Sequence, residues 1–165
     1  MLPPFCVEAL MKKERKTARQ ILSANPRELV SVGPDDTVLR ALQLMADEDV
    51  TTVLVLQSSN LIGVLSQRDY ARKVDVLGRN AANTKVGDIM TTQVFYVTPE
   101  HTCDQCLASM HTKRIRHLPV IESGRVIGVL SNSDVLEELL QEDEHFIRVL
   151  EDDMLHLTID TGGAY

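Results

Sequence analysis

The sequence predicts an α/β protein of the α+β type, with two tandem β-α-β-β-α repeats and a C-terminal helix. The first observation is an internal repeat at an offset of 65 residues, which runs without a gap from Val32/Val97 to Asp69/Asp134. The second is that strand-like apolar runs alternate with helix-like apolar spacing in both copies. Because a unit of about 60 residues buries little surface alone, we expect the two units to pack as a pseudo-two-fold pair.

The repeat divides the chain into six segments. They are an N-terminal lead-in (1–16), the first repeat (17–77), a polar linker (78–84), the second repeat (85–141), a C-terminal helix (142–156) and a tail (157–165). Met1 and Met11 are both candidate start residues, and the sequence does not choose between them.

A short helix from Thr17 to Ser23 is expected first, and after it each repeat should form the same elements in order. Each repeat begins with a short strand (29–32 and 94–97), followed by a helix capped by Thr37 or Thr102 and by a second strand (53–56 and 118–121). A tight turn (58–60 and 123–125) then leads to a strand that contains a glycine (62–65 and 127–130), and a helix starts near Ser66 or Ser131. The last helical pattern continues through Leu139, Leu140, Phe146, Ile147 and Leu150 and should end near Met154. This arrangement predicts a long amphipathic helix after the second repeat.

The first long helix of each repeat should bury one apolar stripe. The spacing i, i+3, i+4, i+7 is met by Val38, Ala41, Leu42 and Met45, and in the second repeat by Cys103, Cys106, Leu107 and Met110. Such residues share one face of a helix, so this face is expected to pack against the sheet.

The segment from Ile62 to Asp69 and its copy from Ile127 to Asp134 carry the main functional signal. Each is an apolar strand with a glycine, followed by a serine and, three residues later, an aspartate. Serine at the N-cap and aspartate in the first turn are typical of a helix start. Free backbone N–H groups and the helix dipole favour an anion at such a place, so the duplication suggests two sites. The plainer interpretation is that both aspartates only cap their helices.

Composition excludes several classes of protein. The net charge is −7, and residues 137–153 account for all of it with eight acidic residues and one basic residue. The only basic cluster, at residues 12–16, is short and has no interleaved aromatic residues, so nucleic acid is not an expected partner. No apolar run approaches the ~20 residues that would span a membrane, so no membrane association is expected. No basic region precedes an apolar run at the N-terminus, which argues against a secretory signal.

The three cysteines, Cys6, Cys103 and Cys106, favour a reducing cytoplasm over a disulfide framework. The Cys103-x-x-Cys106 spacing at a helix start could lower a thiol pKa and support redox chemistry. However, the two cysteines align with Val38 and Ala41 of the first repeat, which favours a role in the core. No second Cys-x-x-Cys is present to complete a zinc site, and His117 has no partner at a convincing ligand spacing.

The tandem repeat, with Gly-Val-Leu-Ser-x-x-Asp closing each copy and Arg-His-Leu-Pro-Val at residues 116–120, resembles a pair of CBS domains (cystathionine β-synthase type). Two such domains form a Bateman module. The resemblance covers about residues 17–140 and is closest to small stand-alone bacterial CBS-pair proteins, through the Ser-x-Arg-Asp-Tyr-Ala-Arg-Lys segment at 66–73. It implies binding of an adenosine-containing ligand (AMP, ADP, ATP, NAD or S-adenosylmethionine) in clefts between the repeats.

The resemblance also implies roles for individual residues. Asp69 and Asp134 would hold ribose hydroxyls, and Ser66, Ser131, Arg116 and His117 would lie near phosphate. Arg68 and Arg72, four residues apart on one helix, are further phosphate candidates or simply a solvated face. Adenine is expected among aliphatic residues of the short strand and the strand after it, namely Val32, Val97 and Leu118. The full set of expected ligand-binding residues is Val32, Ser66, Arg68, Asp69, Arg72, Val97, Arg116, His117, Leu118, Pro119, Ser131 and Asp134.

The two copies differ where a ligand's phosphate would lie. Thr51 and Thr52 replace the basic pair Arg116-His117, and Ser133 and Glu137 stand where the first copy has Arg68 and Arg72. We therefore expect two related but unequal sites.

No nucleophile–base–acid set and no glycine-rich phosphate loop is visible, so catalysis is not expected and no cofactor is required. The leading hypothesis is a cytoplasmic sensory module that binds an adenine nucleotide and signals to an unidentified protein through a conformational change, as a homodimer joined by its acidic C-terminal helix. The alternatives are a thiol-based redox regulator or enzyme using Cys103 and Cys106, and a dimeric scaffold that binds nothing small.

Overall fold

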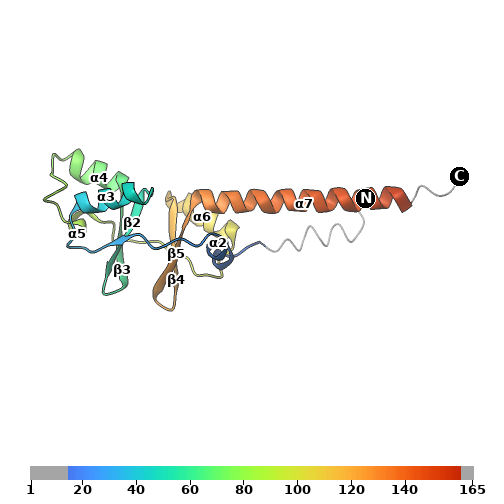
Figure 1. Ribbon diagram of the computed structural model, residues 1–165, viewed down its shortest axis with the longest axis horizontal. Helices are drawn as coiled ribbons and strands as arrows, with labels where there is room; N and C mark the ends of the chain where they lie inside the picture. The colour runs from blue at the N-terminus through green and yellow to red at the C-terminus, as the bar shows by residue number, and fades with distance from the viewer. Residues whose placement is uncertain (1–14, 161–165) are drawn as a thin grey trace.

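The computed structural model describes residues 15–160, with side chains described for residues 15–145, 147 and 148. Two α/β lobes lie side by side, and one long helix extends away from the second lobe (Figure 1). The prediction of two similar mixed α/β units is confirmed. The lead-in before residue 15 and the tail after residue 160 lie outside the described residues.

The first lobe contains a three-stranded sheet with the order β1-β2-β3. Its elements are β1 (Ser31–Val32), α3 (Val38–Asp47), β2 (Thr52–Gln57), β3 (Asn60–Ser66), the short helix α4 (Gln67–Tyr70) and the π-helix η1 (Ala71–Asp75). Strand β1 runs parallel to β2, and β2 pairs antiparallel with β3. The predicted stripe packs on this sheet, with Val38, Ala41 and Met45 no more than 1% exposed.

The second lobe repeats this plan. Its elements are α6 (Cys103–Lys113), β4 (His117–Glu122), β5 (Arg125–Ser131) and α7 (Asn132–Asp160). Strands β4 and β5 are antiparallel, and Cys103, Cys106 and Met110 of α6 are buried against them. The predicted threonine caps are present in both lobes, because the hydroxyls of Thr37 and Thr102 accept from the backbone N–H three residues later.

The prediction of a strand at residues 94–97 is wrong, and Pro119 explains the difference. In the first lobe the N–H of Leu54 donates to the Val30 carbonyl at 3.0 Å, which extends the pairing of β1. The equivalent position in the second lobe is Pro119, which has no N–H to donate. Only a single parallel bridge remains there, between Val97 and Val120.

Both hairpins close with two residues at positive φ. These residues are Ser58 (50°) and Ser59 (67°) in the first lobe, and Ser123 (50°) and Gly124 (77°) in the second. Two successive left-handed residues are typical of the type I′ turn, whose twist matches that of the strands. The predicted tight turns are therefore confirmed in position.

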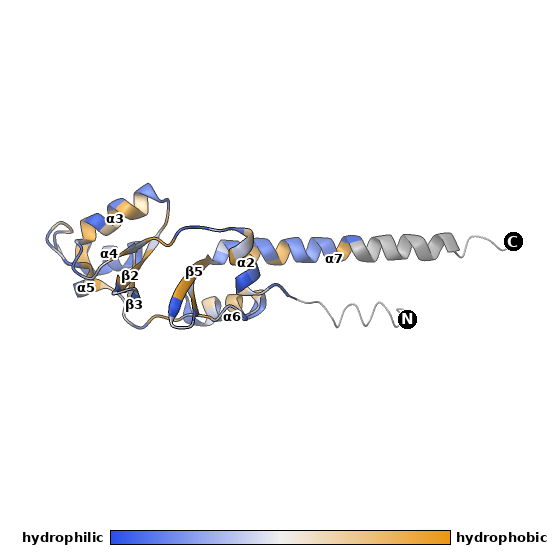
Figure 2. Ribbon diagram, turned by 60° about the horizontal axis from the view of Figure 1, so that its bottom comes forward, coloured by the Kyte–Doolittle hydropathy of each residue, from blue (hydrophilic) through white to orange (hydrophobic). Residues whose placement is uncertain are grey.

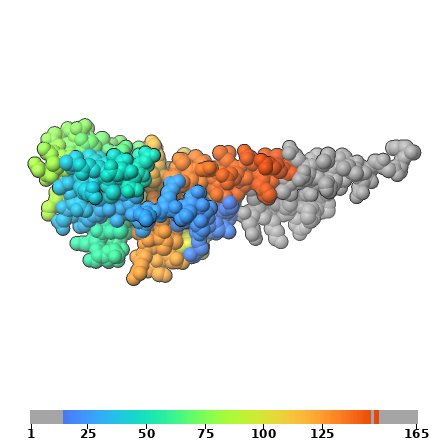
Figure 3. All heavy atoms as spheres, in the orientation of Figure 1, coloured from blue at the N-terminus to red at the C-terminus, as the bar shows by residue number. Residues whose placement is uncertain are grey.

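The two lobes exchange their leading helices. Helix α2 (Ala18–Ala24) begins the first repeat but packs with the second lobe: Thr17 bridges Thr102, and Ala18 and Ile21 lie in the second core. Helix α5 (Val86–Ile89) begins the second repeat but packs with the first lobe, through a bridge from Lys85 to Thr37 and burial of Val86 and Ile89. Figure 3 shows the blue N-terminal segment crossing the surface of both lobes, which joins α2 on one to the strands of the other.

The exchanged helices explain why each copy of the duplicated motif contains a glycine, Gly63 in the first and Gly128 in the second. A Cβ atom at Gly63 would come within 2.7 Å of the Met90 sulfur, and one at Gly128 within 2.6 Å of the Leu22 side chain. Leu22 belongs to α2, and Met90 is the C-cap of α5. Each glycine therefore leaves room for a residue of the exchanged helix, and the close approach is the same in both lobes.

Helix α7 runs without a break from the second repeat to Asp160, over 29 residues. The predicted end near Met154 is therefore wrong, and the segments 142–156 and 157–160 continue the final helix of the repeat. Figure 2 shows apolar residues alternating with polar ones along the part of α7 whose side chains are described. No helix in residues 15–160 is long and apolar enough to cross a bilayer.

The acidic start of α7 holds the N-terminal segment. Lys16 forms an ion pair with Glu138, and its backbone N–H donates to Glu142 at 2.8 Å. Arg15 forms ion pairs with Glu142 at 3.0 Å and with Asp104 of α6 at 3.1 Å. Part of the negative charge of residues 137–153 is thus neutralised within the chain, and these contacts anchor the segment leading into α2.

A cleft between the repeats as the candidate functional site

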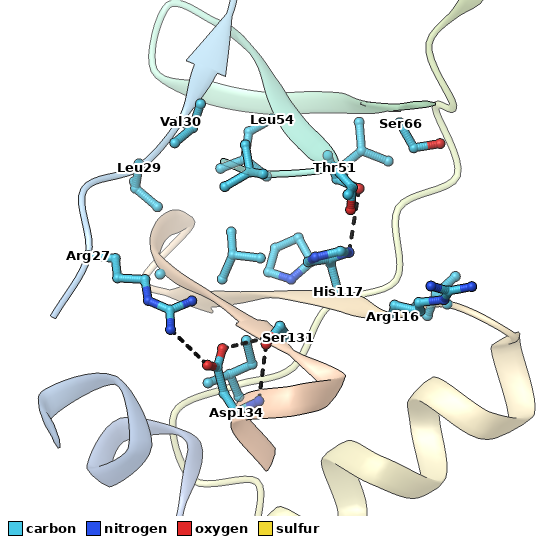
Figure 4. Close-up of a pocket in the computed structure, with 18 of the residues that line it drawn as sticks. Arg27, Leu29, Val30, Thr51, Leu54, Ser66, Arg116, His117, Ser131 and Asp134 are labelled. Atoms are coloured by element: carbon cyan, nitrogen blue, oxygen red, sulfur yellow. Dashed lines mark hydrogen bonds and ion pairs between the residues drawn. The ribbon is translucent and has the colours of Figure 1, made fainter. Parts of the chain in front are cut away.

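A cleft of about 1220 Å³ lies between the two sheets, where the duplicated serine–aspartate segments meet. Nine of the expected ligand-binding residues line it: Ser66, Arg68, Asp69, Arg72, Arg116, His117, Pro119, Ser131 and Asp134. They come from both repeats, so the structure joins the two predicted sites into one continuous cleft. Figure 4 shows the cleft with its second-repeat residues in the lower half.

Three expected residues do not line the cleft. Val32, Val97 and Leu118 are at most 7% exposed and belong to the two cores. Because side chains alternate along a strand, His117 and Pro119 face the cleft while Leu118 faces the opposite way, into the core. Nearby residues, Val30, Phe95 and Pro119, line the cleft instead, so the structure does not bring the three predicted adenine contacts to it.

An apolar wall lies on one side of the cleft. It is formed by Leu29 and Val30, in the segment between α2 and β1, together with Leu54 of β2. Leu29 is 39% exposed, which leaves an apolar surface open to a ligand. A flat aromatic ring could cover this wall and lose its own contact with water.

Asp134 stands at the edge of this wall, in the first turn of α7. Its Oδ2 accepts from the backbone N–H of Ser131 at 2.9 Å, and its own N–H donates to the Ser131 hydroxyl at 3.1 Å. Its Oδ1 accepts from the Arg27 guanidinium at 3.0 Å. The Arg27 side chain is 68% exposed, so the partner of this oxygen can move into solvent at little cost.

Asp69 has the same cap but more partners. Its Oδ2 accepts from the N–H and the hydroxyl of Ser66 at 3.0 and 2.8 Å. Its Oδ1 accepts from the Thr91 hydroxyl at 3.0 Å and from the Lys73 ammonium at 2.9 Å. Burial alone would raise the pKa of Asp69, but the hydrogen bonds from Lys73 and Ser66 outweigh it and hold the pKa below its ordinary value.

Lys73 also fixes the neighbouring helix. Its ammonium donates to the carbonyl of Ile89, the last residue of α5, at 2.7 Å. The same side chain therefore connects Asp69 to an exchanged helix, and the Asp69 carboxylate is held within the fold.

His117 lies where the two repeats meet. Its Nδ1 is 3.4 Å from the hydroxyl of Thr52, which is the equivalent residue of the first repeat. Burial lowers the pKa of His117 below its ordinary value. The negative charge of Asp134 raises this pKa and the positive charge of Arg116 lowers it further, so the net change is a decrease. The ring is thus mainly neutral at neutral pH, and an anion arriving beside it would favour its protonated form.

Four arginines line the cleft with no ion-pair partner in the described part of the chain. They are Arg68, Arg72, Arg114 and Arg116. Lys113 also lines the cleft, with its ammonium 4.4 Å from the centre of the Phe95 ring. Figure 4 shows Arg116 on the same side of the view as Ser66, and Arg27 and Asp134 on the other.

The environment of Cys103 and Cys106 disfavours the reactive thiolate form. Both are fully buried free thiols in the core of the second repeat. Burial raises the pKa of Cys103 to about 12 and that of Cys106 to about 11. Since the thiolate is the reactive form, the predicted core role is favoured over redox chemistry.

Several cleft residues were not predicted from the sequence. They are Arg27, Leu29, Val30, Thr52, Leu54, Lys73, Thr91 and Arg114, which contact the expected residues or line the cleft. Arg27 and Thr91 follow the exchanged helices, so the exchange must be known before either can be placed beside its aspartate. Thr52 could have been found, because it is the partner of His117 in the 65-residue register.

No group of three or more His, Cys, Asp or Glu side chains that could hold a metal ion occurs among the described residues. The polar groups of the cleft are instead hydroxyls, carboxylates and guanidinium groups, arranged around an apolar wall. Such a set suits an organic ligand that carries both hydroxyl and anionic groups.

Two exchanged β-α-β-β-α units enclosing one ligand-sized cleft define a tandem regulatory module of the CBS-pair class. The family model for the CBS domain matches twice, at residues 18–75 and 86–141. The chain therefore belongs to the CBS domain family. CBS-pair proteins are typically regulatory and not enzymes.

Among curated relatives, the Arabidopsis thaliana protein "CBS domain-containing protein CBSX3, mitochondrial" is 39% identical over 113 residues, which cover 66% of this chain and 55% of that protein. The match to the A. thaliana protein CBSCBSPB2 covers only 22% of that relative. The chain thus spans about half the length of one of these relatives and about a quarter of the other.

Solved structures show the same fold. The CBS domain structure of NE2398 is 38% identical with a TM-score of 0.73, over 77% of this chain and 99% of that one. The CBS domain pair of MJ0100, in complex with 5′-methylthioadenosine and S-adenosyl-L-methionine, is 17% identical with a TM-score of 0.67, over 78% and 99% of the two chains. The second likeness concerns the fold alone.

Proposed function

We propose that the cleft binds an adenosine-containing ligand and that the chain is a regulatory module controlled by this binding. The observation that carries the proposal is Asp134, whose Oδ1 is held, among the described residues, only by the exposed Arg27 beside an apolar wall. A carboxylate can accept from two adjacent ribose hydroxyls at once. The CBS pair of MJ0100 with its two adenosine ligands supports the view that this fold accommodates such molecules.

The ligand is placed by the chemistry of each wall. Adenine lies against Leu29, Val30 and Leu54, and the ribose hydroxyls donate to Asp134. A phosphate group extends from there towards Ser131, His117 and Arg116 in the middle of the cleft. AMP, ATP, NAD and S-adenosylmethionine all contain the adenosine part of this arrangement.

Binding is coupled to the packing of the repeats through Arg27. This residue lies in the segment that connects α2, packed on the second lobe, with β1 of the first lobe. A ribose on Asp134 takes the place of the Arg27 guanidinium and frees this segment to move. Because Asp134 lies in the first turn of α7, the same event alters the base of the helix that extends from the module.

The test is isothermal calorimetry with AMP and ATP on the wild type and on Asp134→Asn. Loss of a charged acceptor for two hydroxyls should weaken binding by about 10- to 100-fold. Asp47→Asn, at an exposed position at the end of α3, is the matched control and should bind as the wild type does. Equal affinity of Asp134→Asn and wild type for both nucleotides would exclude the ribose assignment.

We also propose that the module is a homodimer that acts on another protein. Helix α7 leaves Leu136, Leu140 and Ile147 exposed at 40%, 65% and 53%, which supports α7 as the contact surface. Light scattering after size exclusion should give twice the chain mass at micromolar concentration. Leu140→Glu should give the monomer mass, whereas a wild-type monomer would exclude the dimer.

A further inference from the structure

Helix α7 carries two apolar stripes on different faces, and its own lobe covers only the first. The first stripe, with Val135 and Leu139, packs on the core of the second lobe. The second stripe contains Leu136, Leu140 and Ile147, which are 40%, 65% and 53% exposed. Figure 1 shows α7 continuing past both lobes, so the lobes end well before the helix does.

The spacing of the second stripe is that of a coiled coil. Alternate steps of four and three residues from Leu136 reach seven positions, all within α7. These positions are Leu136, Leu140, Asp143, Ile147, Leu150, Met154 and Leu157. Six of the seven are apolar, and the series spans about three heptads, which is the pattern of a seam between two helices that wind around each other.

The residue types of this seam favour two parallel helices. In a heptad written abcdefg, Ile147 occupies an a position, and Leu150 and Leu157 occupy d positions. A β-branched residue at a with leucine at d favours a parallel coil of two strands. The seam of one chain is therefore suited to the same seam of a second copy.

The charges beside the seam act against an antiparallel pair. The e positions hold Glu137, Glu144 and Glu151, and the g positions hold Leu139, Phe146 and Asp153. In an antiparallel pair the e positions of the two helices face each other, so glutamate would meet glutamate. In a parallel pair each e position faces a g position, where two of the three residues are apolar, so the repulsion between like charges is smaller.

Asp143 is the one polar position of the seam, and Arg15 supplies its counter-charge. The Asp143 side chain is 54% exposed, and its Oδ1 lies 3.3 Å from the Arg15 guanidinium. In a parallel pair in register, each Asp143 faces its own copy, and two Arg15 side chains stand beside the two carboxylates. In every other alignment within the seam Asp143 would face an apolar residue, which is a costly place for a charge. A single polar position of this kind fixes the alignment of a coiled coil.

We infer that α7 pairs with a second copy of this chain as a parallel, in-register, two-stranded coiled coil from Leu136 to Leu157. This inference rests on the homodimer of the proposed function and adds how its two copies are joined. The seam begins two residues after Asp134, which lines the cleft. A parallel coil therefore holds both clefts at the same end of the dimer, whereas an antiparallel coil would place them at opposite ends.

Cysteine cross-linking distinguishes these orientations. Leu140→Cys and Met154→Cys are made separately in a Cys6→Ser background, whose other thiols, Cys103 and Cys106, are buried. The two seam positions are 14 residues apart, about 21 Å along a helix, whereas a disulfide needs Cα atoms within about 7 Å. In a parallel pair in register each variant lies opposite itself, so under mild oxidation both should form a disulfide-linked dimer on a non-reducing gel.

An antiparallel pair gives a different pattern. If it is centred on residue 147, neither variant cross-links alone, and only a refolded mixture of Leu140→Cys and Met154→Cys does. If it is centred elsewhere, at most one of the two variants cross-links alone. Either pattern would overturn the inference. Gln141→Cys, at an exposed position beside the seam, is the control and should remain a single chain on the gel.

Arg15 and Asp143 provide a second test in the dimer itself, by analytical ultracentrifugation. Arg15→Gln should raise the dissociation constant of the dimer about 3- to 10-fold, because each copy loses the counter-charge of its seam carboxylate. In an Asp143→Leu background the same substitution should change the constant little, since no charge remains in the seam. Arg19→Gln, at an arginine paired with Glu122, is the control. Equal effects of Arg15→Gln in both backgrounds would overturn the place of Asp143 in the seam.

The outcomes separate this inference from the proposed function. If light scattering shows a wild-type dimer and neither seam variant cross-links, the homodimer stands and the coiled coil is excluded. If the wild type is a monomer, both are excluded. Ligand binding in the cleft is measured independently by calorimetry, and neither result decides it.

Discussion

The two serine–aspartate segments of this chain have the same local structure and different surroundings. In both, an aspartate oxygen accepts from the N–H of the capping serine, at 3.0 Å for Asp69 and 2.9 Å for Asp134. The other oxygen of Asp69 is held by Thr91 and by Lys73, which is 40% exposed. Within the described part of the chain, the other oxygen of Asp134 has only Arg27 as a partner, and the Arg27 side chain is 68% exposed. The cap is shared, but only one of the two carboxylates can easily exchange its partner.

This difference shows what the duplication retained and what it did not. A helix cap depends on residues three positions apart, so both copies of the motif carry it with them. The remaining partners come from elsewhere in the chain: Thr91 and Arg27 follow the exchanged helices, and Lys73 is replaced by Glu138 in the second repeat. Residues outside the motif therefore decide which copy is a structural cap and which can receive a ligand.

The largest effect on stability is expected at the two motif glycines. In Gly63→Ala the new methyl group meets the Met90 sulfur at 2.7 Å and the Thr91 carbonyl oxygen at 3.0 Å, and the carbonyl cannot move aside. In Gly128→Ala the three atoms nearest to the new methyl group all belong to the flexible Leu22 side chain, the closest at 2.6 Å. We expect losses of about 2–3 kcal/mol for Gly63→Ala and about 1 kcal/mol for Gly128→Ala in urea unfolding.

Leu22→Ala makes space beside Gly128 and serves as the control for that site. Gly128→Ala should cost less in the Leu22→Ala background than in the wild type, since the clash is gone. Equal losses at Gly63 and Gly128 would mean that the two exchanged contacts are equally adaptable.

The two aspartates should differ next, in the absence of ligand. Asp69→Asn removes the charge partner of Lys73 at a half-buried place and should cost about 1–2 kcal/mol of unfolding free energy. Asp134→Asn removes an ion pair with an exposed arginine and should cost less than about 1 kcal/mol. Chemical denaturation at pH 7 measures both, and an equal or larger loss for Asp134→Asn would contradict the structural role of Asp69.

His117 should make stability depend on pH in a way that Thr52 cannot. Since burial lowers its pKa in the folded protein, the unfolded chain binds more protons just below its ordinary value of about 6.5. Its contribution to stability is complete above this value and is lost as the pH falls towards the folded-state pKa, by at most about 1.4 kcal/mol per pH unit. His117→Thr gives both repeats the same residue. Between pH 7 and 5 the unfolding free energy of this variant, measured by urea denaturation, should fall less steeply with decreasing pH than that of the wild type. A slope unchanged from the wild type would assign the titration to other histidines.

The smallest expected change in stability is at the two hairpin turns, where exchanging serine and glycine should have opposite effects in the two repeats. Ser59 has a φ of 67°, whereas glycine occupies the equivalent position 124 with a φ of 77°. Ser59→Gly should stabilise the protein and Gly124→Ser should destabilise it, each by about 0.5 kcal/mol, because glycine adopts positive φ without steric cost. Thermal unfolding of the two variants should shift in opposite directions, and shifts in the same direction would contradict this explanation.

The sequence predicted those parts of the molecule that depend on local pattern. The threonine caps, the helix stripes, the hairpins and the capping serines were all placed correctly, because each depends on residues a few positions apart. The strand at 94–97 was not, because its shortening depends on a proline in the neighbouring strand.

The residues of the cleft were predictable only in part. Nine of twelve expected ones line it, whereas Val32, Val97 and Leu118 are buried in the two cores. Strand alternation explains Leu118, but Val30 and Phe95 line the cleft two positions before Val32 and Val97. Arg27 and Thr91 could not be placed from the sequence. The leading helices lie outside the 65-residue register, and their equivalent residues are 68 apart, as in Thr17/Lys85 and Leu22/Met90.

The exchange of α2 and α5 also determines how this chain can fold. The core of the first lobe is complete only when Val86 and Ile89 are present, and that of the second requires Ala18 and Ile21 from near the other end of the chain. Neither repeat has all of its own core, so a cut at the polar linker would leave each half with an open apolar face. Both halves must therefore acquire structure together, and the pair should unfold in one transition in which neither repeat persists without the other.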